Sequence, residues 1–530
     1  MKINSIAFAC AALCSASAFA NVAVPGALDP STATNVAVYY MAGATAQLPA
    51  VAATVPSTLF DPGTPVSWMY QGNAGTPNFV GTTYFPANPI PSSGAGVNNS
   101  VNGWYGIANS TATGLPAGTQ LFVVYNANAG SMTGLAQILT PLNVTPTAYP
   151  VSWTKIPSLG ASGSAFTCTA VTPKNSTIAA QVCSTTDANH DVYAPLDLAL
   201  SDVYATEAVP GVLTPGSNNM NLLGTLTQVT TGLEGFGIIV NPTLYVALQT
   251  AQGLVPGDLG GANQPSISRQ DYASLISTAG ADAGNGSYGP LNGLTADFVQ
   301  DPNNPTDATQ IVIERRTNYS GTQSASDMFF LNYICGTAAG SYLLPFDNGT
   351  QFGSSTPTLA IGGTSTYFAE QGGTGGVKNA LTLGNAKAIP AGAYGIGVVS
   401  LENTPTVTDP TSWQYVKLNG VSPNWKYTPG TGGTTNNANY TYDTQQKASI
   451  ISGQYQFAVE MNAYYRTTSV NANIKTIDAT VAKNLSLSNL HNLTGVAYLD
   501  FPTNPSAVLA TQARYSHQGS NCAPLWNKNF

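Results

Sequence analysis

Short apolar runs separated by polar turns recur along this chain. The runs that predict buried strands are Val36–Met41, Leu121–Tyr125, Leu196–Leu200, Gly235–Val240 and Gln310–Ile313. Most of them lead into a turn of small residues and then into apolar residues at helical spacing. Strands that alternate with helices in this way predict an α/β fold with mostly parallel sheets.

Three of the expected helices carry start signals. Asn241 and Pro242 supply an N-cap and a first-turn proline for a helix through Gln252, and Ser268-x-x-Asp271 is close to a capping box. A third helix is expected after Ser320, running to about Cys335 with Gly336 as its stop. A further helical run follows Gly130-Ser131 through Leu139, and ordered structure is expected again at Tyr455–Tyr465.

Three stretches interrupt this pattern. Residues 55–118, 145–190 and 408–447 are rich in Gly, Pro, Asn, Ser and Thr and lack a clear period. We expect them to be long irregular insertions at the surface.

The first twenty residues predict export. A basic start at Met1-Lys2 is followed by the apolar stretch Ile6–Leu13 and by Ala18-Phe19-Ala20, which fits a signal-peptidase site. The apolar stretch is shorter than the roughly 20 residues of a membrane span. We therefore expect residues 1–20 to be a signal peptide and the mature protein to be periplasmic, secreted or at the cell surface. Lipidation at Cys14 is a poor alternative, because Leu13 does not suit that signal.

Charge is scarce. Only 8% of the residues are charged, against about 25% in an average domain, and the net charge is −8. An acidic, weakly charged chain argues against a nucleic-acid partner, which calls for a basic patch. The 26 Tyr and 17 Phe nevertheless provide ample material for packed cores.

The cysteines suggest disulfides. Cys10 and Cys14 would leave with the signal peptide, and the remaining four can pair in three ways. We favour Cys168–Cys183, which closes a short loop, and Cys335–Cys522, which ties a helix end to the C-terminal tail. A metal site is the weaker alternative, since the chain has no Cys-x-x-Cys and only 3 His.

Three turns between a strand and a helix carry groups that suit an oxyanion. Ala44-Thr45, Gly130-Ser131 and Ser320-Gly321-Thr322 each place a hydroxyl beside the free N–H groups of a helix start, and Arg316 precedes Ser320 by four residues. The carboxyl ends of parallel strands share one crevice, so the turns are expected to meet. Ordinary helix capping is the alternative interpretation for each turn taken alone.

Taken in order, these segments resemble the phosphate-binding proteins of ABC importers, in the type II periplasmic binding protein superfamily. The matching residues are Ala42-Gly43-Ala44-Thr45, Gly130-Ser131-Met132-Thr133-Gly134, Asp197-Leu198-Ala199-Leu200-Ser201-Asp202 and Arg316-x-x-x-Ser320-Gly321-Thr322. The chain departs from the family at Ala46, where an aromatic residue is usual, and in its longer gaps.

The resemblance implies a two-lobed fold with a hinge. Lobe 1 would comprise residues 21–234 and 456–530, and lobe 2 residues 235–455. It also implies a non-catalytic solute-binding protein without a cofactor, working with a membrane permease on phosphate or a similar oxyanion. The implied ligand residues are Thr45, Ser131, Asp202, Arg316, Ser320, Gly321 and Thr322.

Asp202 would select among anions. A carboxylate beside a bound dianion is repulsive unless a proton lies between them, and hydrogen phosphate carries that proton whereas sulfate does not. Capping, or pairing with Arg316, is the alternative role for Asp202. Two other functions stay open: a secreted or cell-surface structural protein that keeps this fold and contacts neighbouring surface proteins, and a secreted hydrolase.

Overall fold

The computed structural model describes most of the chain between residues 37 and 527. The described residues are 37–62, 64–71, 77–84, 101–127, 130–140, 166–171, 180–185, 195–207, 220–277, 311–333, 335, 366–389, 392–429, 439–468, 472–486, 493–497, 499, 512–513, 515–517 and 519–527. The predicted signal peptide lies outside them. Within these ranges, no helix has the length and apolar character to cross a membrane.

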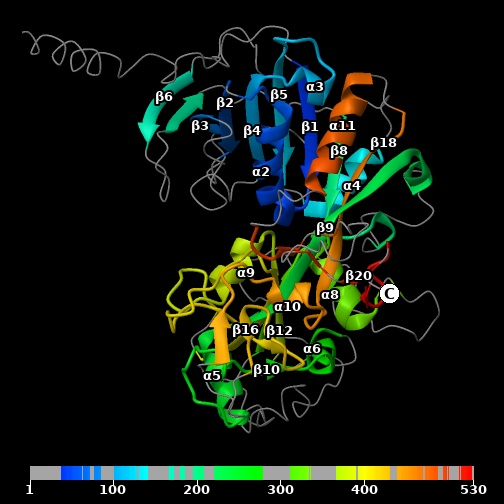
Figure 1. The fold of residues 1–530 in the computed structure, drawn as a ribbon. Helices are drawn as coiled ribbons and strands as arrows, with labels where there is room; N and C mark the ends of the chain where they lie inside the picture. The colour runs from blue at the N-terminus through cyan, green and yellow to red at the C-terminus, as the bar shows by residue number, and fades with distance from the viewer. Residues whose placement is uncertain are drawn as a thin grey trace, which may run out of the picture.

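The described elements form two halves, drawn one above the other in Figure 1. In the upper half, the central strand β1 (Ala37–Gly43) pairs in parallel with β5 (Gln120–Asn126) and with β8 (Leu198–Ser201). The sheet continues through antiparallel strands, and helices pack on it. These further elements are β4 (Val101–Ile107), β2 (Pro65–Gln71), β3 (Pro77–Tyr84), β7 (Ala180–Thr185), β6 (Phe166–Val171), α2 (Leu48–Leu59), α3 (Ser110–Thr113), α4 (Gly130–Ile138) and α11 (Ala472–Leu485).

The lower half is built around another parallel core. Strand β11 (Ile311–Arg316) lies between β12 (Thr366–Gln371) and β13 (Tyr394–Ser400) and is parallel to both. All six residues of β11 are buried, as expected of a central parallel strand. The helices here are α5 (Pro242–Ala251), α6 (Arg269–Ile276), α8 (Gly321–Leu331), α9 (Thr374–Ala380) and α10 (Ala448–Ile451), with short strands β10 (Ser266–Ile267), β14 (Gln414–Tyr415), β15 (Lys417–Leu418), β16 (Trp425–Tyr427) and β17 (Tyr440–Tyr442).

Two long antiparallel strands join the halves. Strand β9 (Leu226–Val240) pairs with β18 (Ala458–Arg466) up to Gly235 and with β13 from Phe236 onward. Figure 1 shows β9 running obliquely from one half into the other. The predicted division between residues 234 and 235 falls beside this change of partner; the lobe boundaries themselves stay a prediction.

The sheet is mixed, which corrects the expectation of mostly parallel strands. Within this sheet the parallel pairs are those of the two central groups, whereas β9, β18 and the strands beyond β5 are antiparallel. The short strands β10 and β15 form a separate parallel pair. The α/β architecture in two halves otherwise agrees with the sequence-based expectation.

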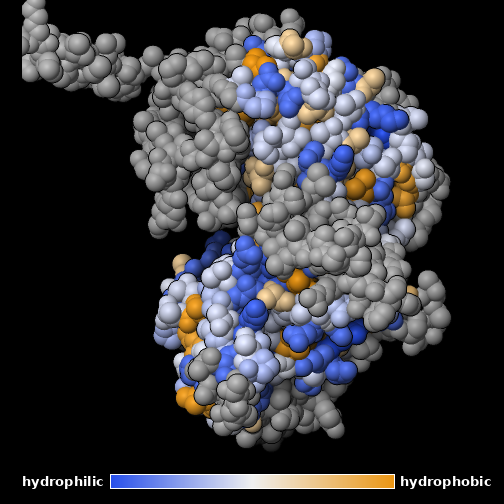
Figure 2. Space-filling model, viewed as in Figure 1, coloured by the Kyte–Doolittle hydropathy of each residue, from blue (hydrophilic) through white to orange (hydrophobic). Residues whose placement is uncertain are grey.

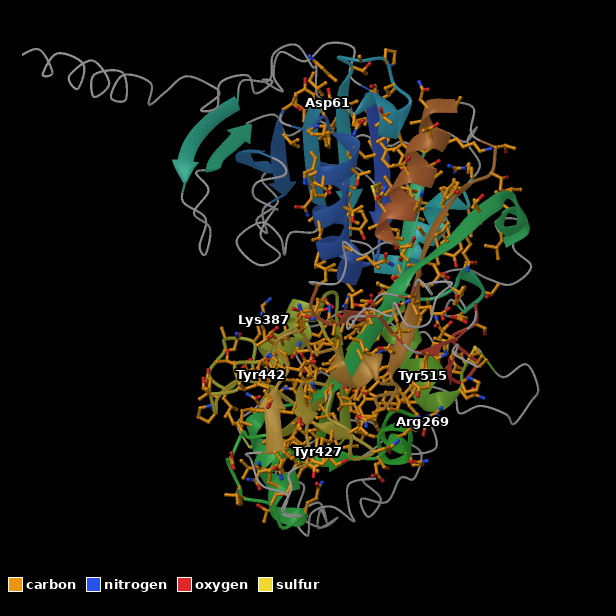
Figure 3. All side chains as sticks on the ribbon, viewed as in Figure 1. Asp61, Arg269, Lys387, Tyr427, Tyr442 and Tyr515 are labelled. Carbon is orange, nitrogen blue, oxygen red and sulfur yellow. A yellow bond between two sulfur atoms is a disulfide. The ribbon has the colours of Figure 1, made fainter. Side chains whose placement is uncertain are left out.

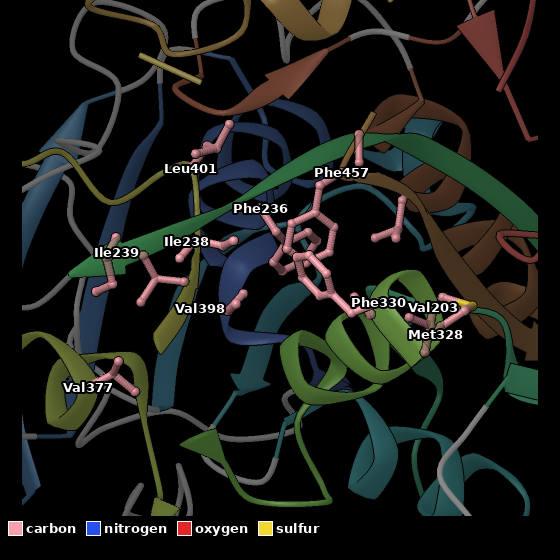
Figure 4. Close-up of a cluster of buried hydrophobic side chains, with 14 of the residues drawn as sticks. Val203, Phe236, Ile238, Ile239, Met328, Phe330, Val377, Val398, Leu401 and Phe457 are labelled. Atoms are coloured by element: carbon pink, nitrogen blue, oxygen red, sulfur yellow. The ribbon is translucent and has the colours of Figure 1, made fainter. Parts of the chain in front are cut away.

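An apolar cluster below β9 fixes the position of α8. Phe457 directly precedes β18, and its ring centroid is 5.5 Å from that of Phe236 on β9 and 4.9 Å from that of Phe330 on α8. Figure 4 shows these rings together with Met328 and Val398 between the helix and the strands. Because the cluster holds the helix, it also holds the turn at its N-terminus.

All three stretches expected to be irregular contain strands, and those within 408–447 are β14, β15, β16 and β17. Within residues 55–118 the structure has the end of α2 and the strands β2, β3 and β4, and within 145–190 it has the β6–β7 hairpin. Apolar residues do alternate in some of these strands, as at Val66, Trp68 and Tyr70 of β2, but the Gly, Pro, Asn and Ser residues around them hid that period. Cys168 and Cys183 stand opposite each other in the hairpin register, and the bond between them stays a prediction.

The local signals that predicted helices are confirmed. Asn241 accepts a hydrogen bond from the Leu244 N–H at 3.0 Å, and Ser268 forms a capping box with Asp271. Helix α8 ends earlier than expected, because Asn332 takes a left-handed conformation with φ 52°. The predicted disulfide between Cys335 and Cys522 is present.

The coloured surface is mostly hydrophilic or weakly polar, with apolar residues scattered over it (Figure 2). The large hydrophobic residues that the described part exposes include Tyr319 and Tyr427. Figure 3 shows Tyr427 and Tyr442 in the lower half, where β16 and β17 pair, and Asp61 in the upper half. This surface is consistent with the low charge of the sequence.

Candidate anion-binding site

A pocket lies where strand ends of the two halves face each other. Its empty space is about 220 Å³, and this figure includes open solvent at its mouth, so the enclosed part is small. The lining residues are Thr45, Ala46, Gly130, Ser131, Asp202, Arg316, Ser320, Gly321, Thr322, Thr374 and Ser400. Its size suits a small ligand.

Close backbone packing brings the turns together. The Met132 N–H donates to the Tyr319 carbonyl at 3.2 Å, so the start of α4 in the upper half bonds the turn before α8 in the lower half. Gly130 has φ +74°, and a Cβ on it would lie 2.8 Å from the Tyr319 oxygen. A glycine is therefore required where the two turns meet.

Ser131 and Asp202 form a bonded pair on the upper wall of the pocket. The Ser131 hydroxyl donates to Asp202 Oδ2 at 3.1 Å, and the Asp202 N–H donates to Ser131 Oγ at 3.3 Å. Both residues are almost fully buried. Asp202 therefore does not serve as a helix cap, and its carboxylate borders the pocket in a fixed orientation.

Arg316 supplies the cation of the pocket. It ends β11 and is 5% exposed. Nη1 donates to Thr374 Oγ1 at 2.7 Å and Nη2 to the Gly372 carbonyl at 3.3 Å, whereas Nε is buried without a partner. Burial lowers the pKa of Arg316 to about 10, against the opposing influence of Asp202 and Glu402, so the guanidinium remains charged at neutral pH. A buried, unused N–H donor is costly, and an anion would satisfy it.

Helix starts add further donors. The first residues of α4, α8 and α9 line the pocket, so the partial positive charge of these helix starts favours an anion. In α4, the N–H groups of Gly130 and Met132 already donate to the Ala127 and Tyr319 carbonyls. Ser320 is the N-cap residue of α8, but its side chain makes no capping hydrogen bond. Thr45 opens the 3₁₀ turn before α2 and donates its hydroxyl to the Ala127 carbonyl at 3.1 Å.

The protonation of Asp202 is finely balanced. Burial raises the pKa of Asp202 to about 7, and the nearby Glu402 adds to this rise. Hydrogen bonds from Ser131 and Glu234 and the charge of Arg316 act in the opposite direction. The carboxyl group can thus accept or donate a hydrogen bond near neutral pH.

All seven residues that the sequence singled out lie around this one pocket. Sequence reasoning missed Thr374 and Ser400. Ser400 ends β13. Thr374 starts α9 after the turn Gly372-Gly373, so this segment, like the other three turns, is a short run of small residues between a strand and a helix. That shared form is the signal that could have revealed Thr374. Within the described ranges, no group of three or more His, Cys, Asp or Glu is arranged to hold a metal ion.

Comparison with known proteins gives a distant structural likeness. No protein-family model matches the chain, and no curated protein matches its sequence. Similar solved structures include an ancestral soluble variant of the human phosphate binding protein, with 14% identity, a TM-score of 0.31, and coverage of 63% of this chain and 85% of that one.

Two bacterial proteins show a comparable likeness. A phosphate binding protein from Stenotrophomonas maltophilia has 17% identity and a TM-score of 0.28, covering 55% of this chain and 70% of that one. An ABC-type phosphate transport receptor from Vibrio cholerae has 11% identity and a TM-score of 0.25, covering 55% and 76%.

Proposed function

We propose that this chain is an extracytoplasmic, non-catalytic solute-binding protein whose ligand is an inorganic oxyanion, with phosphate as the favoured one. The observation that carries the proposal is the buried, unpartnered Nε of Arg316 beside the starts of three helices in a small pocket. Fixed N–H dipoles and a guanidinium around one small volume are the groups that bind an oxyanion.

Asp202 favours hydrogen phosphate over sulfate. Its Oδ2 accepts one hydrogen bond from Ser131. An ionised carboxylate has room for further hydrogen bonds, so it can also accept one from a ligand hydroxyl. Hydrogen phosphate has such a proton, whereas sulfate would bring only negative charge against the carboxylate. Because the pKa of Asp202 is about 7, this discrimination should be strong at pH 8 and weaken as the pH falls below 7.

Isothermal titration calorimetry at pH 8 tests the proposal. Phosphate should bind one to one, and sulfate should bind at least about 100-fold more weakly, the scale of a missing charge-assisted hydrogen bond. The Asp202→Asn variant keeps the size of the side chain and should narrow this gap. Absence of phosphate binding, or equal binding of both anions by the wild-type protein, would contradict the proposal.

We further propose that the protein delivers its ligand to a membrane permease. Ligand closure between two lobes around a hinge would offer a permease one shape when loaded and another when empty. Strands β9 and β18, which pass between the halves, are where such bending would occur. Small-angle X-ray scattering with and without phosphate tests this, and an unchanged radius of gyration on saturation would contradict it.

A further inference from the structure

A second carboxyl group lies behind Asp202. Glu234 is on β9, the strand shared by both halves, and is fully buried. Its carboxyl contacts those of Asp202 and Glu402. Four buried oxygens of this group of three receive no hydrogen bond from an N–H or hydroxyl of the described residues: Asp202 Oδ1, Glu234 Oε1, Glu234 Oε2 and Glu402 Oε2.

One of these contacting carboxyl groups must carry a proton. Carboxylates are acceptors only, so two ionised ones in contact repel each other and leave each other unsatisfied. A proton on one of them turns the contact into a donor and an acceptor. Asp202 accepts a hydrogen bond from Ser131, whereas neither oxygen of Glu234 accepts one from the described residues, so the charge is better supported on Asp202 and Glu234 is the group that keeps the proton. Burial raises the pKa of Glu234 in the same direction.

The other charged groups nearby do not compensate Glu234. Arg316 on β11 acts on Asp202 and Glu402, and Lys378 on α9 acts on Glu402. The phenols of Tyr125 and Tyr415 also face the cluster, and burial raises the pKa of both, so they remain neutral. The hydrogen bond from Glu234 lowers the pKa of Asp202.

We propose that Glu234 is a specificity-determining residue of the anion pocket: its protonated carboxyl donates a hydrogen bond to Asp202, and this bond keeps Asp202 ionised as an acceptor. This inference rests on the proposed function. Glu234 touches no ligand and acts only through Asp202. With the proton of Glu234 in place, Asp202 requires a protonated anion; without it, Asp202 takes up a proton itself and can donate to a fully deprotonated anion such as sulfate.

Two variants at position 234 separate this role from packing. Glu234→Gln keeps an N–H donor toward Asp202, whereas Glu234→Leu removes it at similar volume. At pH 8, the ratio of phosphate to sulfate affinity should stay within about threefold of wild type in the Gln variant and fall at least about tenfold in the Leu variant, a free-energy change of about 1.4 kcal/mol. The pH below which the protein no longer prefers phosphate over sulfate should rise in the Leu variant and stay unchanged in the Gln variant.

The outcomes are distinct. Loss of selectivity in both variants would show that packing alone matters and would overturn the inference, as would unchanged selectivity in the Leu variant. Absence of phosphate binding by wild type would instead refute the proposed function. If the Leu variant does not fold, infrared difference spectra decide: wild type at pH 8 should show a carboxylic-acid carbonyl band that Glu234→Gln lacks, and absence of that band in wild type would overturn the inference.

Discussion

Gly321 and Ser131 lie so close across the two halves that a Cβ on Gly321 would come within 2.3 Å of Ser131 Oγ. This added Cβ would also lie 2.5 Å from Asp202 Oδ2. Contacts this short do not occur between real side chains, so a methyl group here must displace the Ser131–Asp202 pair. The first residue of α8 thus sets how closely the upper wall of the pocket approaches the lower one.

Gly321→Ala should therefore reduce binding more than stability. Alanine is the better helix former by about 1 kcal/mol, which offsets part of the overpacking cost of about 1–3 kcal/mol. Phosphate affinity should fall by at least about 100-fold, because the added methyl disturbs two ligand groups at once. Calorimetry and thermal unfolding measure the two effects. Gly224→Ala is the control, since a Cβ there meets no atom within 4 Å, and equal affinity of both variants would contradict the model of the pocket.

The planar fork of Arg316 should not be replaceable by lysine. Arg316 holds Thr374 and the Gly372 carbonyl with its two terminal nitrogens and leaves Nε for a ligand, a division that one ammonium group cannot reproduce. Hydrogen bonds to charged groups contribute about 1.5–3 kcal/mol, so Arg316→Lys should weaken phosphate binding by about 10- to 100-fold.

Arg269→Lys is the matched control. Arg269 lies over the Phe329 ring, 4.6 Å from its centroid, and is not among the residues that line the pocket. Figure 3 shows it in the lower half. Its replacement should leave the dissociation constant within about twofold of wild type. Equal losses for both variants would indicate a general charge effect rather than a site at Arg316.

The disulfide between Cys335 and Cys522 should stabilise the fold without shaping the pocket. It joins residues 187 apart, just beyond the end of α8, and closing so long a loop contributes up to about 5 kcal/mol, typically about 2–4. Neighbouring Asn521 also ties the tail, through bonds to Glu207 and to the Glu460 N–H. Cys335→Ser should lower the melting temperature and expose the tail to proteolysis while phosphate affinity changes little.

The double variant Cys335→Ser/Cys522→Ser serves as the control. It should be as stable as the single variant to within about 0.5 kcal/mol, because one bond is lost in both. Additive losses would mean that each thiol position contributes by packing rather than through the bond.

Local signals predicted part of this structure well. The caps at Asn241 and Ser268 depend on residues within four positions, and the strand-end turns at Ser131 and Ser320 follow directly from apolar runs. The meeting of those turns could be expected because carboxyl ends of parallel strands share one edge. Their ability to bind an anion stays a prediction.

The non-local parts could not be read from the sequence. The first half of β9, from Leu226, is partly exposed and carries several threonines, so no apolar run marks it. The contact of Glu234 with Asp202 and Glu402 depends on strands that only the sheet order brings together. Glu234 carries no local signal, since a single carboxylate at the end of a polar run is normally solvated.

A last prediction concerns pH and stability in the upper half. Asp478 on α11 is 1% exposed and accepts a hydrogen bond from the Tyr39 hydroxyl at 2.6 Å. Burial raises the pKa of Asp478 from 3.8 to about 8, with a further rise from Asp197 and an opposing effect of Arg466. The folded protein therefore binds a proton here that the unfolded chain releases above pH 4. Stability should fall as the pH rises from about 4 to 8, by up to about 1.4 kcal/mol per pH unit for this group.

Asp478→Asn should remove this contribution. The amide oxygen can still accept from Tyr39, and no charge has to be buried at high pH. The variant should thus be close to wild type at pH 4 and increasingly more stable than wild type up to pH 8, as measured by urea unfolding across that range. Asp61→Asn, which removes the same charge from a half-buried position in the same half, reports the effect of net charge alone. A stability difference between wild type and Asp478→Asn that stays constant with pH would show that Asp478 is ionised in the folded state.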